Sequence, residues 1–165
     1  MPEVGLSFGT GVIVPERGFT VRALGEIAIR CNDLEAMTTF YRDVIGLEPM
    51  ADRGGIRFFQ LDESYGGHTA VLALFEAEGA PETGTASSLH HLALTVDVAE
   101  QSAIVDWYEN QGITYRIEDF TWIGWRGIFT TDPEGNTVEF VAYDASELDQ
   151  MSDSASKKAA PKRSV

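Results

Sequence analysis

Three residues that can bind a metal ion occupy matching places in the two halves of the chain. Glu26 and His91 each lie at the start of a run of alternating apolar and polar residues, and His91 comes 65 residues after Glu26. Glu139 lies in a later run, and Ala73 holds the matching place in the first half. One imidazole and two carboxylates neutralise a divalent cation and leave coordination places for water or for two adjacent substrate oxygens. These three side chains therefore predict a metal site.

The ligand set also indicates the kind of metal and the chemistry. It is rich in oxygen, which favours Mn²⁺, Fe²⁺ or Mg²⁺, while the imidazole of His91 keeps Zn²⁺, Co²⁺ and Ni²⁺ possible. Such an ion acts as a Lewis acid that stabilises an enolate or alkoxide next to the chelated oxygens. Glu26 or Glu139 can then act as a general base that takes a proton from carbon. The residues alone do not choose between these two carboxylates.

The elements that must position these residues form the same series twice. In each half we expect a strand, an amphipathic helix that a glycine ends, and three further strands. In the first half these are residues 25–33, 34–45, 47–51, 56–61 and 70–75. In the second half they are residues 89–97, 99–111, 114–117, 127–131 and 137–143, with a hairpin turn at 132–136. A unit used twice places its equivalent positions around a pseudo-two-fold axis; these positions are Glu26, Ala73, His91 and Glu139.

The composition fits one globular domain, because 165 residues that are 44% hydrophobic can build a single core or two small modules that share one. We expect an N-terminal extension at 1–22, a domain at 23–144 and a flexible C-terminal tail at 145–165. Within the domain, a linker at 77–88 is expected to join a first module, 23–76, to a second, 89–144.

Charge and cysteine content narrow the expected partners and location. A formal net charge of −14 repels phosphate backbones and argues against a nucleic-acid partner. No apolar run approaches the roughly 20 residues of a membrane-spanning helix, and the start of the chain lacks a signal-peptide pattern. Cys31 is the one cysteine, so no disulfide forms within the chain. We therefore expect a cytoplasmic protein with no membrane partner.

Two motifs carry a resemblance to a known family. Residues 40–47, FYRDVIGL, and residues 132–140, DPEGNTVEF, with the spacing of the repeat, resemble the vicinal oxygen chelate superfamily over about residues 24–143. That group includes glyoxalase I, extradiol ring-cleaving dioxygenases, and bleomycin or fosfomycin resistance proteins. The resemblance implies an α+β fold in which two βαβββ modules form a curved mixed sheet around a cleft. It also implies a divalent metal ion, a small-molecule substrate and a homodimer.

By this resemblance, Glu26, His91 and Glu139 match metal ligands, and Glu26 and Glu139 are the catalytic candidates. Ala73 matches a site that glyoxalases fill with Glu and extradiol dioxygenases leave empty. Dioxygenases place His where this chain has Glu26, which puts ring cleavage in doubt. The resemblance thus favours a lyase- or isomerase-like metal enzyme. An extradiol dioxygenase and a metal-free, resistance-type binding protein are the alternatives.

Substrate-binding candidates come from a tryptophan-rich stretch and from strand parity. Trp122, Trp125 and Arg126 can line a cleft with flat apolar surface and a cation. The alternative is that both tryptophans pack under the turn or at a dimer contact. Weaker candidates, from strand parity and the family's cleft, are Phe58, Gln60, Phe75, Thr95 and Tyr143.

The ligand candidates have simpler explanations as well. Glu26 can form an ion pair with Arg30 or Arg126 in a site that binds no metal. His90 is expected on the opposite face of a regular strand from His91, where it would pack or be exposed. The sequence also leaves open whether Glu26 and His91 meet within one chain or between two.

Overall fold

A computed structural model of the chain describes residues 19, 21–76 and 89–144. The predicted linker, 77–88, and the predicted tail, 145–165, lie outside the described residues, as does the predicted extension apart from residues 19, 21 and 22. None of the helices in the described part of the chain is long and apolar enough to cross a membrane.

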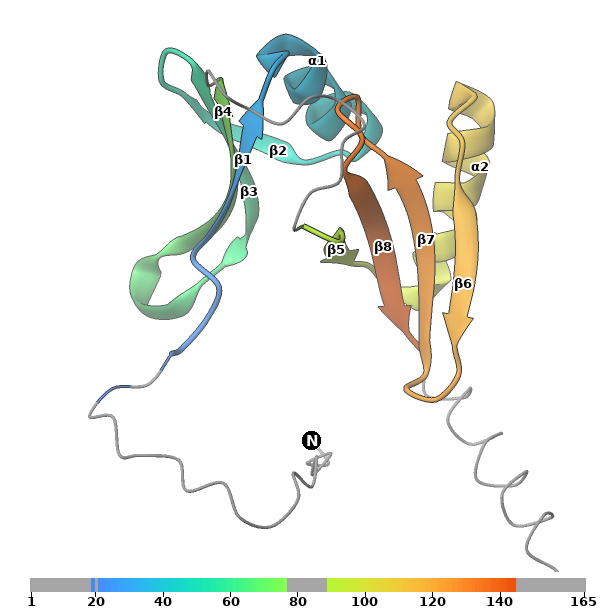
Figure 1. Cartoon of the computed structure of the whole chain (residues 1–165). Coiled ribbons are helices and arrows are strands. Elements are labelled where there is room, and N and C mark those ends of the chain that lie inside the picture. Colours follow the sequence, from blue (N-terminus) through green and yellow to red (C-terminus); the bar gives the residue numbers. More distant parts are fainter. Residues whose placement is uncertain (1–18, 20, 77–88, 145–165) are drawn as a thin grey trace, which may run out of the picture.

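The first module is a four-stranded mixed sheet with one helix on its inner side (Figure 1). Its strand order is β1-β4-β3-β2, with β1 parallel to β4 and the other pairs antiparallel. Asp33 begins the helix by accepting a hydrogen bond from the amide of Ala36, as expected for an N-cap. The elements are β1 (Glu26–Cys31), α1 (Leu34–Thr39), a π-helical turn (Phe40–Val44), β2 (Glu48–Asp52), β3 (Ile56–Glu63) and β4 (Thr69–Glu76).

The second module repeats this plan. Its strand order is β5-β8-β7-β6, with β5 parallel to β8, and a 3-10 turn (Val98–Glu100) leads into its helix. The elements are β5 (Leu92–Thr95), α2 (Gln101–Gln111), β6 (Arg116–Phe120), β7 (Trp125–Thr131) and β8 (Thr137–Tyr143). The predicted α+β class and the βαβββ repeat are therefore confirmed, as two separate four-stranded sheets (Figure 1).

Strand register confirms the internal equivalence in detail. Ala28 of β1 is the register partner of Ala73 in β4, and Ala93 of β5 is the partner of Glu139 in β8. Glu26 lies two residues before Ala28, as His91 does before Ala93. Ala73 and Glu139 are therefore equivalent in the two sheets, and Glu26 and His91 correspond by their spacing from Ala28 and Ala93.

Some boundaries differ from the prediction. Only Leu92–Thr95 of the predicted strand 89–97 pairs with β8, so His91 precedes the strand. The predicted helix at 34–45 is an α-helix only to Thr39, because the following turn is π-helical, with the amide of Ile45 donating to the carbonyl of Phe40.

The two modules share one hydrophobic core, which lies between the helix-side faces of their sheets. In sheet one these faces hold Ile29 and Leu72, and in sheet two they hold Leu92 and Val138. Because strand side chains alternate, the residues between these positions point away from the shared core. Each sheet therefore has an outer face that the other module of the same chain does not cover.

A buried carboxylate joins the modules at the hairpin turn between β7 and β8. Asp132, which is 4% exposed, accepts hydrogen bonds from the Tyr41 hydroxyl at 3.1 Å, from the amides of Glu134 and Asn136, and from the Asn136 side chain. Next to it, Glu134 accepts hydrogen bonds from the amides of Asn32 and Asp33, at 2.5 and 2.7 Å, at the start of α1. The turn thereby attaches the second module to the helix of the first.

Replacing Asp132 with Ala removes the acceptor of these hydrogen bonds and leaves buried donors without a partner. We expect the free energy of unfolding to fall by about 2–4 kcal/mol, measured by urea titration. As a control, Asp119→Ala removes an exposed carboxylate and should change it by less than about 0.5 kcal/mol. Equal effects of the two substitutions would contradict this role of Asp132.

Candidate functional site

A histidine and a buried carboxylate meet on the outer face of sheet two. His91 Nε2 lies 3.1 Å from Glu139 Oε2. Glu139 is 4% exposed although it points away from the shared core. Its surroundings come from its own face of the sheet, where the ring of Phe129 meets the His91 ring edge-on at 6.1 Å between centroids. The predicted pair thus comes together from places 48 residues apart.

The second nitrogen of His91 contacts His90. The two Nδ1 atoms lie 2.7 Å apart, so one ring donates a hydrogen bond and the other accepts it. His90 is exposed, as predicted, but it does not take the face opposite to His91, because both histidines precede β5 and strand alternation does not apply to them. The contact occupies Nδ1 of His91, and Nε2 is the nitrogen that faces Glu139.

Gly127 makes the close approach of Glu139 possible. A Cβ added at this glycine would lie 2.2 Å from Glu139 Oε1 and 2.6 Å from Phe129 Cε2. The carboxylate and the aromatic ring thus occupy the space above β7 that any larger residue would fill. A glycine inside a strand commonly marks such an approach.

Burial raises the pKa of Glu139 above its ordinary value. His91 and Arg116 act in the opposite direction, because their positive charge favours the carboxylate form, while Glu118 adds to the increase. A carboxyl group with a raised pKa that lies beside an imidazole is suited to bind a cation or to accept a proton.

The His91–Glu139 pair fits a metal ion in its geometry. Two ligand atoms that each lie about 2.1 Å from an ion, at right angles to one another, are about 3 Å apart. The observed separation of 3.1 Å matches this spacing without rearrangement. Within the described part of the chain, however, no group of three or more His, Cys, Asp or Glu side chains gathers closely enough to hold a metal.

Glu26 is the predicted ligand that does not join the pair. It lies on the outer face of sheet one, in register with Val71, and it is exposed. Phe58, Gln60 and Phe75 lie on this same outer face, and the rings of Phe58 and Phe75 pack 6.5 Å apart. One chain therefore presents the predicted residues as two separate groups.

The other group shares the outer face of sheet two with Glu139. Trp125 and Tyr143 are register partners on this face and are both exposed, and Thr95 lies on β5 with the same parity as Ala93. Trp122 is exposed in the turn before β7. Arg126 lies on the opposite face, in register with Ala142, and pairs with Asp119 at 3.4 Å. The structure thus separates Arg126 from Trp125, which the sequence had grouped.

Sequence reasoning missed three residues of this site, namely Gly127, Phe129 and Arg116. Phe129 is the register partner of Glu139, and Arg116 is the register partner of Phe129. Parity of the expected strand 127–131 already placed Phe129 on one face with Gly127. The strand register that pairs Phe129 with both Glu139 and Arg116 is known only from the structure of the sheet.

Comparisons with known proteins agree with this fold. A family model for the Glyoxalase/Bleomycin resistance protein/Dioxygenase superfamily matches residues 23–140. Comparison with curated proteins finds no match.

Solved structures resemble the chain across most of their own length. A lactoylglutathione lyase from Agrobacterium tumefaciens is 27% identical, with a TM-score of 0.58, over 73% of this chain and 92% of that one. A glyoxalase/dioxygenase from Nostoc punctiforme is 19% identical, with a TM-score of 0.61, over 81% and 99%. The fosfomycin resistance protein FosX from Listeria monocytogenes is 17% identical, with a TM-score of 0.57, over 78% and 98%. The last two likenesses concern the fold alone.

Replacing Gly127 with Ala should displace Glu139 and Phe129, because the new methyl group has no room. We expect a loss of about 1–3 kcal/mol in unfolding free energy and a shift of the His91 ring signals in ¹H–¹⁵N NMR spectra. Gly25→Ala is the matched control, since a Cβ there meets only His68 at an ordinary 3.6 Å. Unchanged His91 signals in Gly127→Ala would contradict the positioning role.

The raised pKa of Glu139 predicts a pH dependence of stability. The folded chain binds this proton more tightly than the unfolded chain, so the contribution is present below the ordinary value of 4.5 and is lost as pH rises through the higher folded pKa. The unfolding free energy of the unsubstituted protein, minus that of Glu139→Gln, should therefore fall from about pH 4 upward in chelator-treated samples. A difference that rises with pH would show that His91 and Arg116 outweigh burial.

Proposed function

Because this chain belongs to the Glyoxalase/Bleomycin resistance protein/Dioxygenase superfamily, we propose that it is a divalent-metal-dependent enzyme of the lyase or isomerase type. Its substrate is a small molecule that offers two adjacent oxygens. The observation that carries the proposal is the 3.1 Å separation of His91 Nε2 and Glu139 Oε2, with Glu139 buried on the outer face of sheet two. A bound divalent ion would supply Lewis-acid polarisation of the substrate oxygens.

The third ligand in this proposal is Glu26 of a second copy of the chain. Both outer faces turn away from the core that the modules share, so Glu26 and the His91–Glu139 pair cannot face each other within one chain. A homodimer that sets the outer face of sheet one against that of sheet two brings them together. In this homodimer, the outer face that carries the exposed Trp125 and Tyr143 lies opposite the face of the second copy that carries Phe58 and Phe75. These aromatic side chains form the apolar walls of a cleft.

Glu139 is the better candidate for the general base. Its burial raises its pKa, which makes a carboxylate a stronger acceptor for a proton from carbon. The hydrogen-bonding contact of His90 with His91 holds the imidazole in place while Glu139 moves. Glu26, which is exposed on its own sheet, is assigned to ligation.

A metal-free binding protein is the second candidate function. It is favoured by the finding that two ligands, not three, come together within the described residues of one chain. In that case His91 and Glu139 form an ion pair at the floor of a small-molecule site. The same metal-binding measurement distinguishes the two functions.

Purified without chelators and titrated with Mn²⁺, Fe²⁺, Co²⁺, Ni²⁺, Zn²⁺ or Mg²⁺, the protein should bind about one ion per chain. His91→Ala should weaken binding by more than about 100-fold, because it removes a ligand. His68→Ala, which changes a histidine on the other module, is the control. Absence of binding to every ion would favour the metal-free protein.

The origin of the third ligand can be tested by mixing two variants. Glu26→Ala and His91→Ala homodimers should each bind metal weakly. A mixed dimer contains one site with both substitutions and one with neither, so it should regain about half of the sites. No recovery on mixing would contradict a site shared between subunits.

Activity assays then distinguish a lyase from a dioxygenase. Glutathione-dependent conversion of 2-oxoaldehydes would support the lyase assignment. Oxygen consumption on catechols would support a dioxygenase instead.

A further inference from the structure

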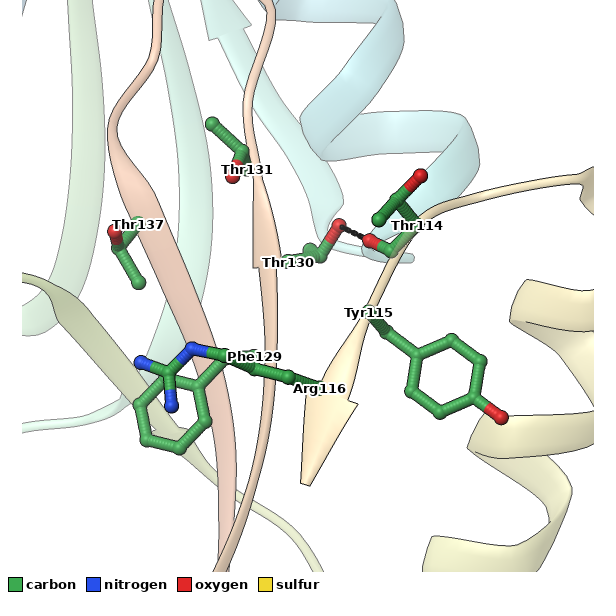
Figure 2. Close-up of a pocket in the computed structure, with 7 residues that line it drawn as sticks. All are labelled: Thr114, Tyr115, Arg116, Phe129, Thr130, Thr131 and Thr137. Carbon is green, nitrogen blue, oxygen red and sulfur yellow. Dashed lines mark hydrogen bonds between the residues drawn. The ribbon is translucent and has the colours of Figure 1, made fainter. Parts of the chain in front are cut away.

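A cation lies on the buried aromatic ring of the site. The guanidinium carbon of Arg116 is 3.9 Å from the centre of the Phe129 ring, and Figure 2 shows the guanidinium group lying over this ring. Phe129 is 4% exposed, whereas the Arg116 side chain is 51% exposed. The ring thus supports one side of the guanidinium while much of the group stays open to a ligand.

Arg116 belongs to the same row across sheet two as Glu139. Each residue of the row is a register partner of the next, and the row runs Ala93, Glu139, Phe129, Arg116. Neighbouring strands are about 4.8 Å apart, so Arg116 starts about 10 Å from Glu139 and its side chain returns over the intervening strand. The guanidinium therefore lies about 5–10 Å from the His91–Glu139 pair.

The corresponding row of module one has no charged group. By the same register it runs Ala28, Ala73, Phe58, Ala51. The phenylalanine is present in both rows, while Arg116 has alanine as its counterpart, as Glu139 does. The aromatic ring that can support a cation is therefore present in both rows. The arginine is present only in the row of module two, which contains Glu139.

A small cavity borders this cation. It has a volume of about 150 Å³ and is lined by Arg116, Phe129 and the hydroxyl-bearing Thr131 and Thr137, among others (Figure 2). Thr131 and Thr137 are register partners on the face that carries Glu139. Hydroxyl groups and a guanidinium that line one pocket suit an oxyanion, and the volume suits a carboxylate and a few attached atoms.

Glu118 is the group with which such an anion must compete. It pairs with Nη1 of Arg116, and its side chain is 48% exposed. Ion pairs between exposed side chains contribute little to stability, whereas a ligand carboxylate can accept two parallel N–H hydrogen bonds from the guanidinium. The pair with Glu118 therefore does not prevent anion binding.

We propose that Arg116, with Thr131 and Thr137, forms an oxyanion subsite, and that the substrate carries a carboxylate at the end remote from its adjacent oxygens. This inference rests on the proposed function, since the adjacent oxygens are those bound at His91 and Glu139. It narrows the substrate class to acids in which the two groups are separated by about 5–10 Å.

A pair of matched probes tests the subsite. 3,4-Dihydroxybenzoate and 3,4-dihydroxybenzamide share their adjacent oxygens and their size, and they differ in the charge at the far end. For the Mn²⁺-loaded protein, calorimetry should show the acid binding about 10–100-fold more tightly than the amide. Arg116→Gln should abolish this difference between the acid and the amide, and Arg116→Lys should keep part of it.

Glu118→Gln is the opposing control. This substitution removes the carboxylate that competes for Arg116 and leaves Arg116 itself in place. The acid should therefore bind more tightly, and the amide should not. Equal affinities of acid and amide in the unsubstituted protein would overturn the subsite, as would a preference for the acid that survives Arg116→Gln.

The failure of the proposed function would look different. If no metal binds, the metal-free protein is titrated with the same two probes while the Arg116 Nε–H signal is followed by NMR. A shift with the acid and not with the amide would support the subsite although the metal proposal had failed. Metal binding together with equal affinities for both probes would overturn the subsite and leave the metal proposal standing.

Discussion

The shared core between the helix-side faces of the two sheets is the constraint on which the rest of the structure depends. Ile29 and Leu72 meet Leu92 and Val138 there, and burying such side chains contributes about 1.5–3 kcal/mol each. Strand alternation then turns every second residue outward, including Glu26 and Glu139. The packing that stabilises the monomer is thus the reason why its candidate ligands are divided between two outer faces.

The outer face of sheet two accepts a local energetic cost at Glu139. A carboxylate on a solvent-facing strand would ordinarily stay hydrated, yet Gly127 and Phe129 enclose this one and burial raises its pKa. A partly compensated buried charge in a surface that could have been fully polar is typical of a functional site. Asp132 shows the contrast, because its buried carboxylate has several donors and serves the structure.

The local sequence pattern was enough to predict the fold, whereas the composition of the candidate site depends on which strand residues are register partners. Period-two alternation and the two glycine-stopped helices predicted the repeat, and strand register confirmed the equivalence of Ala73 with Glu139. The prediction that Trp125 and Arg126 line the same cleft was wrong, because β7 begins at Trp125 and neighbouring strand residues point to opposite faces. His90 was misplaced for the converse reason, since β5 begins only after His91.

The comparison of the two rows explains why a duplicated unit does not imply a duplicated function. Register makes Phe58 equivalent to Phe129, so both copies retain an aromatic ring at the centre of the outer face. The flanking positions have diverged, with Ala73 opposed to Glu139 and alanine opposed to Arg116. In this row, module two therefore carries two charged groups, whereas module one carries alanine at both positions. Because the shared core keeps the two outer faces of one chain apart, the charged row of one module and the alanine row of the other would meet only in the homodimer that we propose.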